Sequence, residues 1–135
     1  GSDVFSVTSF NELARDGQDA ARQNLLQPEA EPRVPYIANV LGAEPAIAAT
    51  DYMKNYAEQV RAFIPAESYA VLGTDGYGRS DSRENLRTHF EVNRHYVVVA
   101  TLNELAKRGD VEPSAVTEAI SKYEIDVNKP NPLFC

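Results

Sequence analysis

The chain has 135 residues, of which 43% are hydrophobic, and a formal net charge of −7 at pH 7. This composition suits one soluble domain with a packed core, and no run approaches the roughly 20 apolar residues of a membrane span. The negative charge argues against non-specific binding to nucleic acid, whose phosphates would be repelled. The only cysteine, Cys135, excludes an internal disulfide and a cysteine-based metal cluster, which fits a reducing cytoplasm.

The first predicted elements are a strand and a long helix. Residues 3–8 form a short β-branched and aromatic run, which predicts a strand. Ser9 and Glu12 then form an S-x-x-E capping box in front of a helix from Phe10 to Leu26. A proline-rich segment interrupts regular structure after this helix, and a short helix is predicted directly behind Pro35.

The middle of the chain predicts two strands with a helix between them. Residues Ala46 to Thr50 suit a buried strand, and Asp51 can cap the helix that follows. That helix is predicted from Tyr52 to Ile64, where apolar side chains recur every three or four residues before Pro65 ends it. A second strand is predicted from Ser68 to Leu72. The connection is long enough for a helix to return the chain, so we expect the two strands to be parallel.

Three further helices are predicted in the C-terminal third, over residues 82–90, 93–109 and 112–123. The middle one is ambiguous, because residues 96–100 read YVVVA and have strand propensity. An asparagine at the start of this segment can cap a helix, and a glycine at its end can stop one. We therefore predict a single helix there.

The alternation of strands and helices predicts an α/β fold, namely a three-layer sandwich around a mainly parallel sheet. Residues 1–125 are expected to form this domain. Residues 126–135 contain two prolines and no periodicity, so we expect an extended tail that docks through Leu133 and Phe134 or frays. A flavodoxin-like nucleotide-binding protein is one alternative within the same fold class.

A glycine-rich loop, GTDGYGRS at residues 73–80, follows the second strand. Its pattern GxxxxGRS differs at one position from the phosphate-binding GxxxxGK[ST] pattern. Arg79 replaces the lysine, and a guanidinium has a different reach and geometry. Asp75 and Asp81 place two carboxylates where phosphate oxygens would lie, which costs about 1–4 kcal/mol per charge pair. These residues argue against a bound nucleotide.

Two other interpretations of the loop stay open. In the structural one, the glycines permit a tight turn, and Ser80, Asp81 or Ser82 caps the next helix. Arg79 would then reach a carboxylate on a facing surface. In the binding one, the backbone amides of the loop and Arg79 hold an anion or a regulatory ligand.

The sequence offers no catalytic or metal-binding constellation. His89 and His95 are the only histidines, and no nucleophile elbow of the G-x-S-x-G kind accompanies them. His89 lies near a predicted helix end, where interaction with the terminal carbonyls is the simpler explanation. The carboxylates are scattered and lack the spacing of known metal sites. We therefore predict no catalytic, cofactor-binding or metal-binding residues.

The glycine loop and the residues after it carry a family resemblance. GTDGYGRS, followed by Glu84, Leu86 and the pair His89-Phe90, is similar to the GxDxFGxS…L…HF signature in the C-terminal domain of transketolase-like, thiamine-diphosphate enzymes. Tyr77 replaces the phenylalanine of that signature. Longer strings, among them SVTSFNELARDGQDAARQN and GTDGYGRSDSRENLRTHFEV, resemble the homodimeric bacterial pyruvate dehydrogenases within this family, and the resemblance extends over essentially the whole chain.

The resemblance implies a role in an enzyme of a multienzyme complex. Such enzymes decarboxylate pyruvate and pass the acetyl group to the lipoyl group of an acetyltransferase component. Their thiamine diphosphate and Mg²⁺ lie between the N-terminal and middle domains of two subunits, and none of the residues that activate them maps onto this chain. The resemblance also implies a C-terminal domain without its first strand and helix, which by itself is inactive and supports a cytoplasmic homodimer. The residues expected to form an interface or a structural loop are Asp75, Tyr77, Arg79, Ser80, Asp81 and Arg83.

Overall fold

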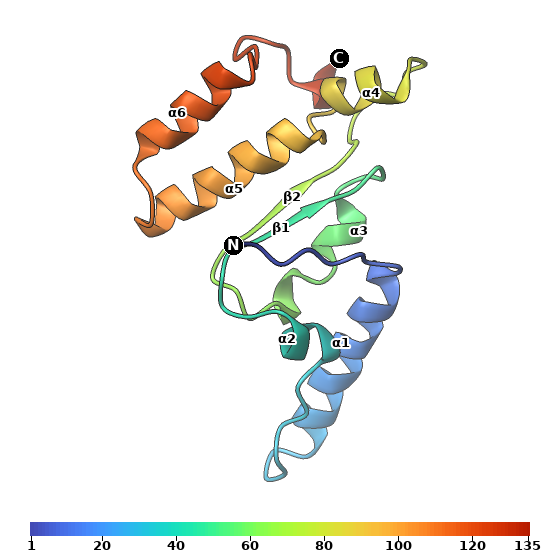
Figure 1. The fold of residues 1–135 in the computed structure, drawn as a ribbon. Helices are drawn as coiled ribbons and strands as arrows, with labels where there is room; N and C mark the ends of the chain where they lie inside the picture. Colours follow the sequence, from blue (N-terminus) through green and yellow to red (C-terminus); the bar gives the residue numbers. More distant parts are fainter.

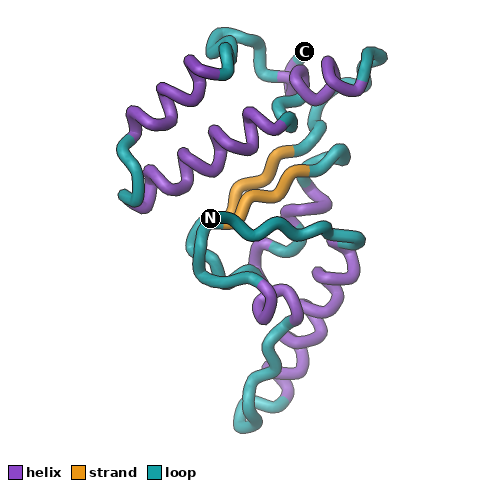
Figure 2. Tube along the Cα trace, in the orientation of Figure 1, coloured by secondary structure: helices purple, strands orange, loops and turns teal.

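The computed structural model describes residues 1–135, and its centre is a sheet of two short parallel strands. Strand β1 spans Ala46–Ala49 and strand β2 spans Tyr69–Leu72. Their register places Ala46 opposite Tyr69 and Ala49 opposite Leu72. Figure 2 shows the two strands side by side with helical segments around them. The predicted strand pair and its parallel direction are confirmed.

Helices lie on two sides of this sheet (Figure 1). The first layer contains α1 (Phe10–Leu26), α2 (Tyr36–Val40), α3 (Asn55–Glu58) and a 3-10 turn, η1 (Arg61–Phe63). The second layer contains α5 (Arg94–Arg108) and α6 (Pro113–Lys122), while α4 (Arg83–His89) and a second 3-10 turn, η2 (Pro132–Phe134), lie together at one end of the molecule.

Neighbouring residues at the start of the second strand contact opposite layers. Tyr69 packs against the first helical layer, and its hydroxyl donates a 2.8 Å hydrogen bond to the carbonyl of Ala57 in α3. Ser68 precedes it, and its hydroxyl donates to the carboxylate of Glu104 in α5. Successive side chains of a strand point to opposite faces of a sheet, so these two bonds define a helix–sheet–helix arrangement. The three-layer α/β fold is thereby confirmed.

The apolar core lies in the first layer. Ala14 of α1, Ile37 of α2 and Val60, which precedes η1, form a buried cluster. Partly buried side chains, among them Phe63 and Tyr69, pack around it. Gly17 lets Phe63 approach α1 closely, because a Cβ at this glycine would lie 2.4 Å from the phenyl ring. This side of the sheet is joined mainly by van der Waals packing.

A buried carboxylate joins the second layer to the start of the second strand. Glu104 is the only charged residue that is buried, with an exposed fraction of 8%. Its carboxylate accepts hydrogen bonds from Ser68 and, at 2.7 Å, from the ammonium of Lys107. Helices α5 and α6 form an antiparallel pair in which the rings of His95 and Tyr123 stack with centroids 4.4 Å apart.

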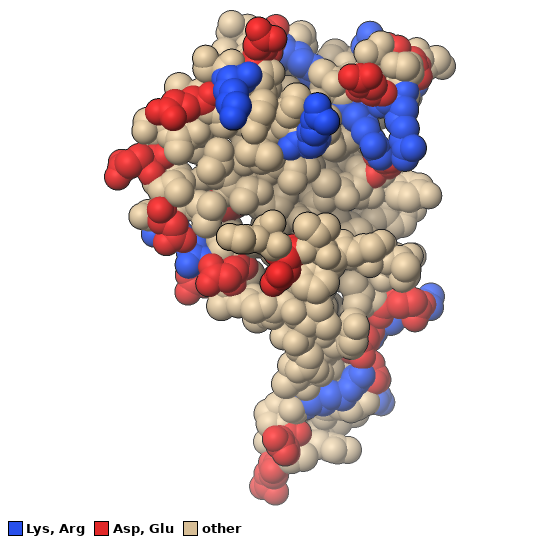
Figure 3. Space-filling model, viewed as in Figure 1, with Lys and Arg blue, Asp and Glu red and all other residues tan.

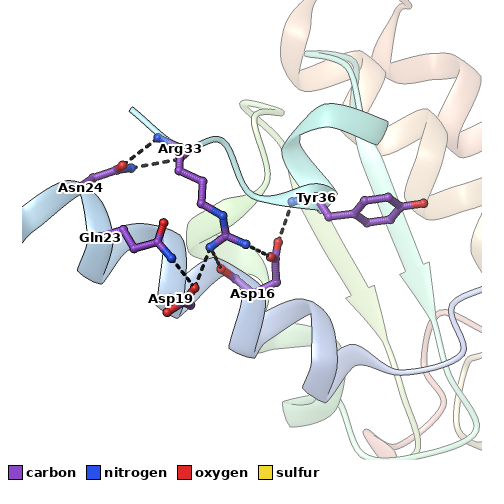
Figure 4. A network of polar contacts seen from close by, with 6 residues as sticks. All are labelled: Asp16, Asp19, Gln23, Asn24, Arg33 and Tyr36. Atoms are coloured by element: carbon purple, nitrogen blue, oxygen red, sulfur yellow. Dashed lines mark hydrogen bonds and ion pairs between the residues drawn. The ribbon is translucent and has the colours of Figure 1, made fainter. Parts of the chain in front are cut away.

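A polar network holds the proline-rich segment against α1 (Figure 4). The Arg33 guanidinium contacts the carboxylates of Asp16 and Asp19. The Asn24 side chain exchanges two hydrogen bonds with the Arg33 backbone, at 2.8 and 3.0 Å. Asp16 also accepts the backbone N–H of Tyr36 at 2.6 Å, so it positions the start of α2.

Several predicted helix caps agree with the structure, although the Glu12 carboxylate pairs with Arg15 and does not complete the capping box with Ser9. The hydroxyls of Ser9 and Ser82 accept backbone N–H groups at the starts of α1 and α4. The Asn93 side chain does the same for α5, and Gly109 ends that helix with a left-handed φ of 83°. The ambiguous YVVVA segment is therefore helical, because both of its termini are capped.

Two predicted elements of the N-terminal half are wrong. Residues 3–8 are not a strand, because they form no backbone hydrogen bonds and Val4 is 92% exposed. The single helix predicted from Tyr52 to Ile64 is instead the short α3 followed by η1. Asp51 does not cap it, because its carboxylate forms ion pairs with α4.

The C-terminal tail docks through a different residue from those predicted. Pro132 is buried, whereas Leu133 and Phe134 are 47% and 77% exposed. The Lys129 ammonium fixes the tail further upstream by donating to the carbonyl of His89 at 2.6 Å. The tail therefore packs beside α4 and ends in η2. None of the helices is both long and apolar enough to cross a membrane.

Candidate functional site

An open cavity of about 360 Å³ lies between the glycine loop and α4. The loop forms one wall and the helix the other, and Asp51, which follows the first strand, contributes to the rim. Basic side chains gather at this end of the molecule (Figure 3). The residues that line the cavity are Asp51, Thr74, Gly76, Tyr77, Gly78, Arg79, Arg83, Leu86, Arg87 and Phe90.

Polar contacts with the segment after β1 hold the start of the glycine loop. The backbone N–H of Thr74 donates to the Tyr52 carbonyl at 2.9 Å, and its hydroxyl donates to the Asp51 carbonyl at 2.9 Å. Asp75 accepts the backbone N–H of Lys54 at 2.9 Å. Asp75 thus binds a backbone amide of its own chain and does not line the cavity.

Gly76 brings the glycine loop into contact with the C-terminal tail. Its φ of 117° is a conformation that residues with a Cβ rarely adopt. A Cβ at this position would also lie 2.1 Å from the Pro132 carbonyl oxygen. The other glycine of the cavity, Gly78, has open space where its Cβ would be. The tail therefore requires a glycine at position 76 but not at position 78.

An ion pair joins the strand end to α4 at the rim of the cavity. The guanidinium of Arg87 binds both carboxylate oxygens of Asp51, with distances of 2.7 and 3.1 Å. Arg83 approaches the same carboxylate at 3.5 Å. The hydrogen bond from Arg87 lowers the pKa of Asp51, and it does so against the opposing effect of burial. Asp51 is consequently ionised at neutral pH and paired chiefly with Arg87.

The remaining cavity arginines have few partners. The Arg79 side chain has one polar neighbour, the Nδ1 atom of His89 at 3.4 Å. Arg83 has only the long contact with Asp51, and its side chain is 78% exposed. Burial and the charge of Arg79 lower the pKa of His89, which favours the neutral imidazole.

Asp81 stabilises the start of α4 and lies outside the cavity lining. Its carboxylate accepts the backbone N–H of Ser82 at 2.7 Å and the side chain of Asn85 at 2.8 Å. Asp81 and Asp75 are both turned to local donors, so their charges do not occupy the cavity. Asp81 nevertheless interacts electrostatically with Arg79, so part of the repulsion that the sequence suggested for a phosphate at this loop remains.

The structure brings together three of the six residues singled out from the sequence. Tyr77, Arg79 and Arg83 line the cavity, whereas Asp75, Ser80 and Asp81 do not. Sequence reasoning missed Asp51 and Arg87, which lie 36 positions apart and meet only in the folded chain. Arg87 could have been found from its spacing, because it lies four residues after Arg83 and therefore shares a face of the same helix.

No group of three or more His, Cys, Asp or Glu side chains is arranged to hold a metal ion. The residues present therefore do not fit a Mg²⁺ site. The cavity offers guanidinium groups and a single carboxylate, which is the donor set for an anion and not for a divalent cation.

The parallel strands enclosed by two helical layers define an α/β domain, and comparison with known proteins gives its family. The family described as the transketolase-like TK C-terminal domain matches residues 1–93. The chain belongs to this family.

Several curated relatives resemble the chain over nearly its whole length. It is 65% identical over 132 residues to the pyruvate dehydrogenase E1 component of Escherichia coli K12, covering 98% of the chain. The proteins of the same name from Haemophilus influenzae and Pseudomonas aeruginosa are 60% and 58% identical, over 98% and 100% of the chain. The chain spans 15% of the length of the first two relatives and 16% of the third.

Proposed function

We propose that the chain is the C-terminal, structural and dimer-supporting domain of a cytoplasmic pyruvate dehydrogenase E1 component. The observation that carries this proposal is the 65% identity with a relative of that name over 98% of the chain. In this proposal the whole enzyme decarboxylates pyruvate with thiamine diphosphate and Mg²⁺ held outside residues 1–135. It then transfers the acetyl group to the lipoyl group of the dihydrolipoamide acetyltransferase component.

The limited burial within the chain supports a role in assembly. Only 12 of the 135 residues are buried, which is few for a chain of this length to be stable without further contacts. Large apolar side chains are instead exposed on one short segment, namely Tyr52, Met53 and Tyr56 at 71%, 50% and 42%, and the rings of Tyr52 and Tyr56 lie 5.7 Å apart. Surfaces of this kind mark contacts with other protein surfaces. The contacting surfaces in this proposal are the N-terminal and middle domains of the enzyme and the second subunit of the homodimer.

The proposal assigns no step of the reaction to this chain. Residues 1–135 provide neither a metal-binding group nor a nucleophile paired with a base. Asp75 and Asp81 are proposed to hold the glycine loop and the start of α4, as their hydrogen bonds indicate. Ser80 is left as a residue of the proposed domain interface, because it is exposed and does not line the cavity.

The test compares the full-length protein with the isolated 135-residue chain. Both are supplied with pyruvate, thiamine diphosphate and Mg²⁺, and carbon dioxide release is measured. We expect release from the full-length protein and none from the chain alone. A full-length protein from which this 135-residue segment has been deleted should sediment as a monomer. Decarboxylation by the chain alone, or an intact dimer without it, would contradict the structural role.

A further inference from the structure

The cavity between the glycine loop and α4 has a charge opposite to that of the protein. Its lining contains three arginines and one aspartate, a formal charge of +2, in a chain whose net charge is −7. The single carboxylate, Asp51, is already bound through both oxygens by Arg87. The charge that remains for a ligand is therefore that of Arg79 and Arg83.

These two guanidinium groups have hydrogen-bond donors to spare. Each carries five N–H donors in a planar fork that matches the oxygens of a phosphate or carboxylate. Arg79 contacts only a histidine ring nitrogen at 3.4 Å, and Arg83 contacts only a carboxylate at 3.5 Å. Both distances are long for charge-assisted hydrogen bonds, which measure about 2.7–2.9 Å. The donors are thus available to an incoming anion.

The rest of the lining favours an anion with an organic part. Leu86, Phe90 and the ring of Tyr77 form apolar surface beside the arginines. Gly78 leaves the loop side without a Cβ, so a ligand can approach the backbone there. The volume of about 360 Å³ lies within the range of small-molecule pockets, which begins at about 300 Å³.

We propose that this cavity binds a small phosphate monoester. The phosphate, which carries nearly two negative charges at pH 7, would bind Arg79 and Arg83. Its organic group would lie against Tyr77, Leu86 and Phe90. Arg87 acts as a positioning residue, because its ion pair neutralises Asp51, the one carboxylate of the cavity lining. This site is independent of pyruvate decarboxylation and needs no metal ion.

The test is calorimetric titration of the full-length protein with phenyl phosphate, inorganic phosphate and phenol. The variant is Arg79→Gln combined with Arg83→Gln. The matched control is Arg22→Gln combined with Arg94→Gln, which removes the same charge from exposed positions outside the cavity lining. Arg87 is left intact, so that the ion pair at the rim is preserved.

We expect phenyl phosphate to bind several-fold more tightly than inorganic phosphate, and phenol not to bind. The cavity variant should weaken the phenyl phosphate affinity at least about tenfold, because two charge-assisted contacts are lost. The control variant should change it less than about twofold. Binding that is unchanged in the cavity variant, or equally weakened in the control, would overturn the proposal. Absence of any phenyl phosphate binding to the unmodified protein would overturn it as well.

Discussion

The two helical layers are attached to the same sheet by different physical means. The first layer, α1 to η1, packs an apolar cluster of Ala14, Ile37 and Val60 against the strands. The second layer, α5 and α6, places the buried carboxylate of Glu104 against Ser68 at the start of the second strand. Apolar packing is affected neither by the screening of charges nor by titration, whereas carboxylate contacts depend on both. The two faces of one small sheet are therefore expected to respond differently to salt and pH.

The largest effect on stability is expected from truncating a buried side chain of the first layer. Ile37→Ala should lower the free energy of unfolding by about 2–5 kcal/mol, because the truncated side chain is 6% exposed and its space does not refill. Leu25→Ala is the matched control, since Leu25 is 77% exposed, and it should cost less than about 0.5 kcal/mol. Urea denaturation at low and high salt measures the free energy of unfolding of both variants. A strong salt dependence of the Ile37 effect would contradict the apolar character of this layer.

Gly76 tests the attachment of the tail, which lies on the α4 side of the molecule. Gly76→Ala should cost about 1–3 kcal/mol, because it combines a strained φ with a clash against the Pro132 carbonyl. Gly78→Ala should be nearly neutral, since its Cβ would enter open space. Limited proteolysis should release residues 126–135 faster in the Gly76 variant only. Equal cleavage of both variants would show that this contact does not hold the tail.

Glu104 tests the polar attachment of the second layer. Glu104→Gln should cost about 1–2 kcal/mol, because it removes the charge that binds Lys107. Hydrogen bonds from Lys107 and Ser68 lower the pKa of Glu104 in the folded chain. Its stabilising contribution is therefore complete above the ordinary pKa of a glutamate and is lost as the pH falls below it.

Thermal unfolding from pH 7 to pH 3 measures this contribution. The difference between the unmodified chain and Glu104→Gln should shrink as the pH falls. Glu118→Gln on the exposed surface of α6 is the control and should show no such convergence. A difference that stays constant with pH would mean that Glu104 acts through packing alone.

The smallest effect concerns Tyr69, the polar contact on the apolar side of the sheet. Tyr69→Phe should cost about 0.5–1.5 kcal/mol, because the hydrogen bond to Ala57 is lost while the ring packing stays. Burial, with a smaller contribution from Glu58, raises the pKa of Tyr69 to about 12. The unmodified chain should therefore lose stability as the pH rises from about 10 towards 12, since the unfolded tyrosine ionises first. The phenylalanine variant should lack this part of the alkaline loss in denaturation curves.

The sequence predicted the fold best where the determinants are local. Capping by Ser9 and Asn93 and the stop at Gly109 depend on near neighbours in the sequence and are confirmed. For the cap of α4 the sequence left three adjacent residues open, and the structure selects Ser82. The strand predicted at residues 3–8 failed because a strand is completed by the hydrogen bonds of a partner, which no periodicity reveals.

The candidate site was only partly predictable for the same reason. Arg79 and Arg83 stood out within the glycine-loop region, but the cavity also depends on Asp51 and Arg87, which meet across 36 positions. Asp75 and Asp81 carry the expected charges, yet local donors turn their carboxylates away from the cavity. Side-chain direction at such a loop is decided by its neighbours in space and not by residue type.

The network around Arg33 has a consequence for the order of folding. Arg33 and its partners on α1 are separated by at most 17 residues, so the loop that they close is short. The entropy lost on closing a loop grows with its length, and local contacts form early. We expect α1 and the proline-rich segment to assemble into a native-like hairpin before the two strands, 23 positions apart in register, have paired. This hairpin would then serve as the preformed surface on which the rest of the first layer condenses.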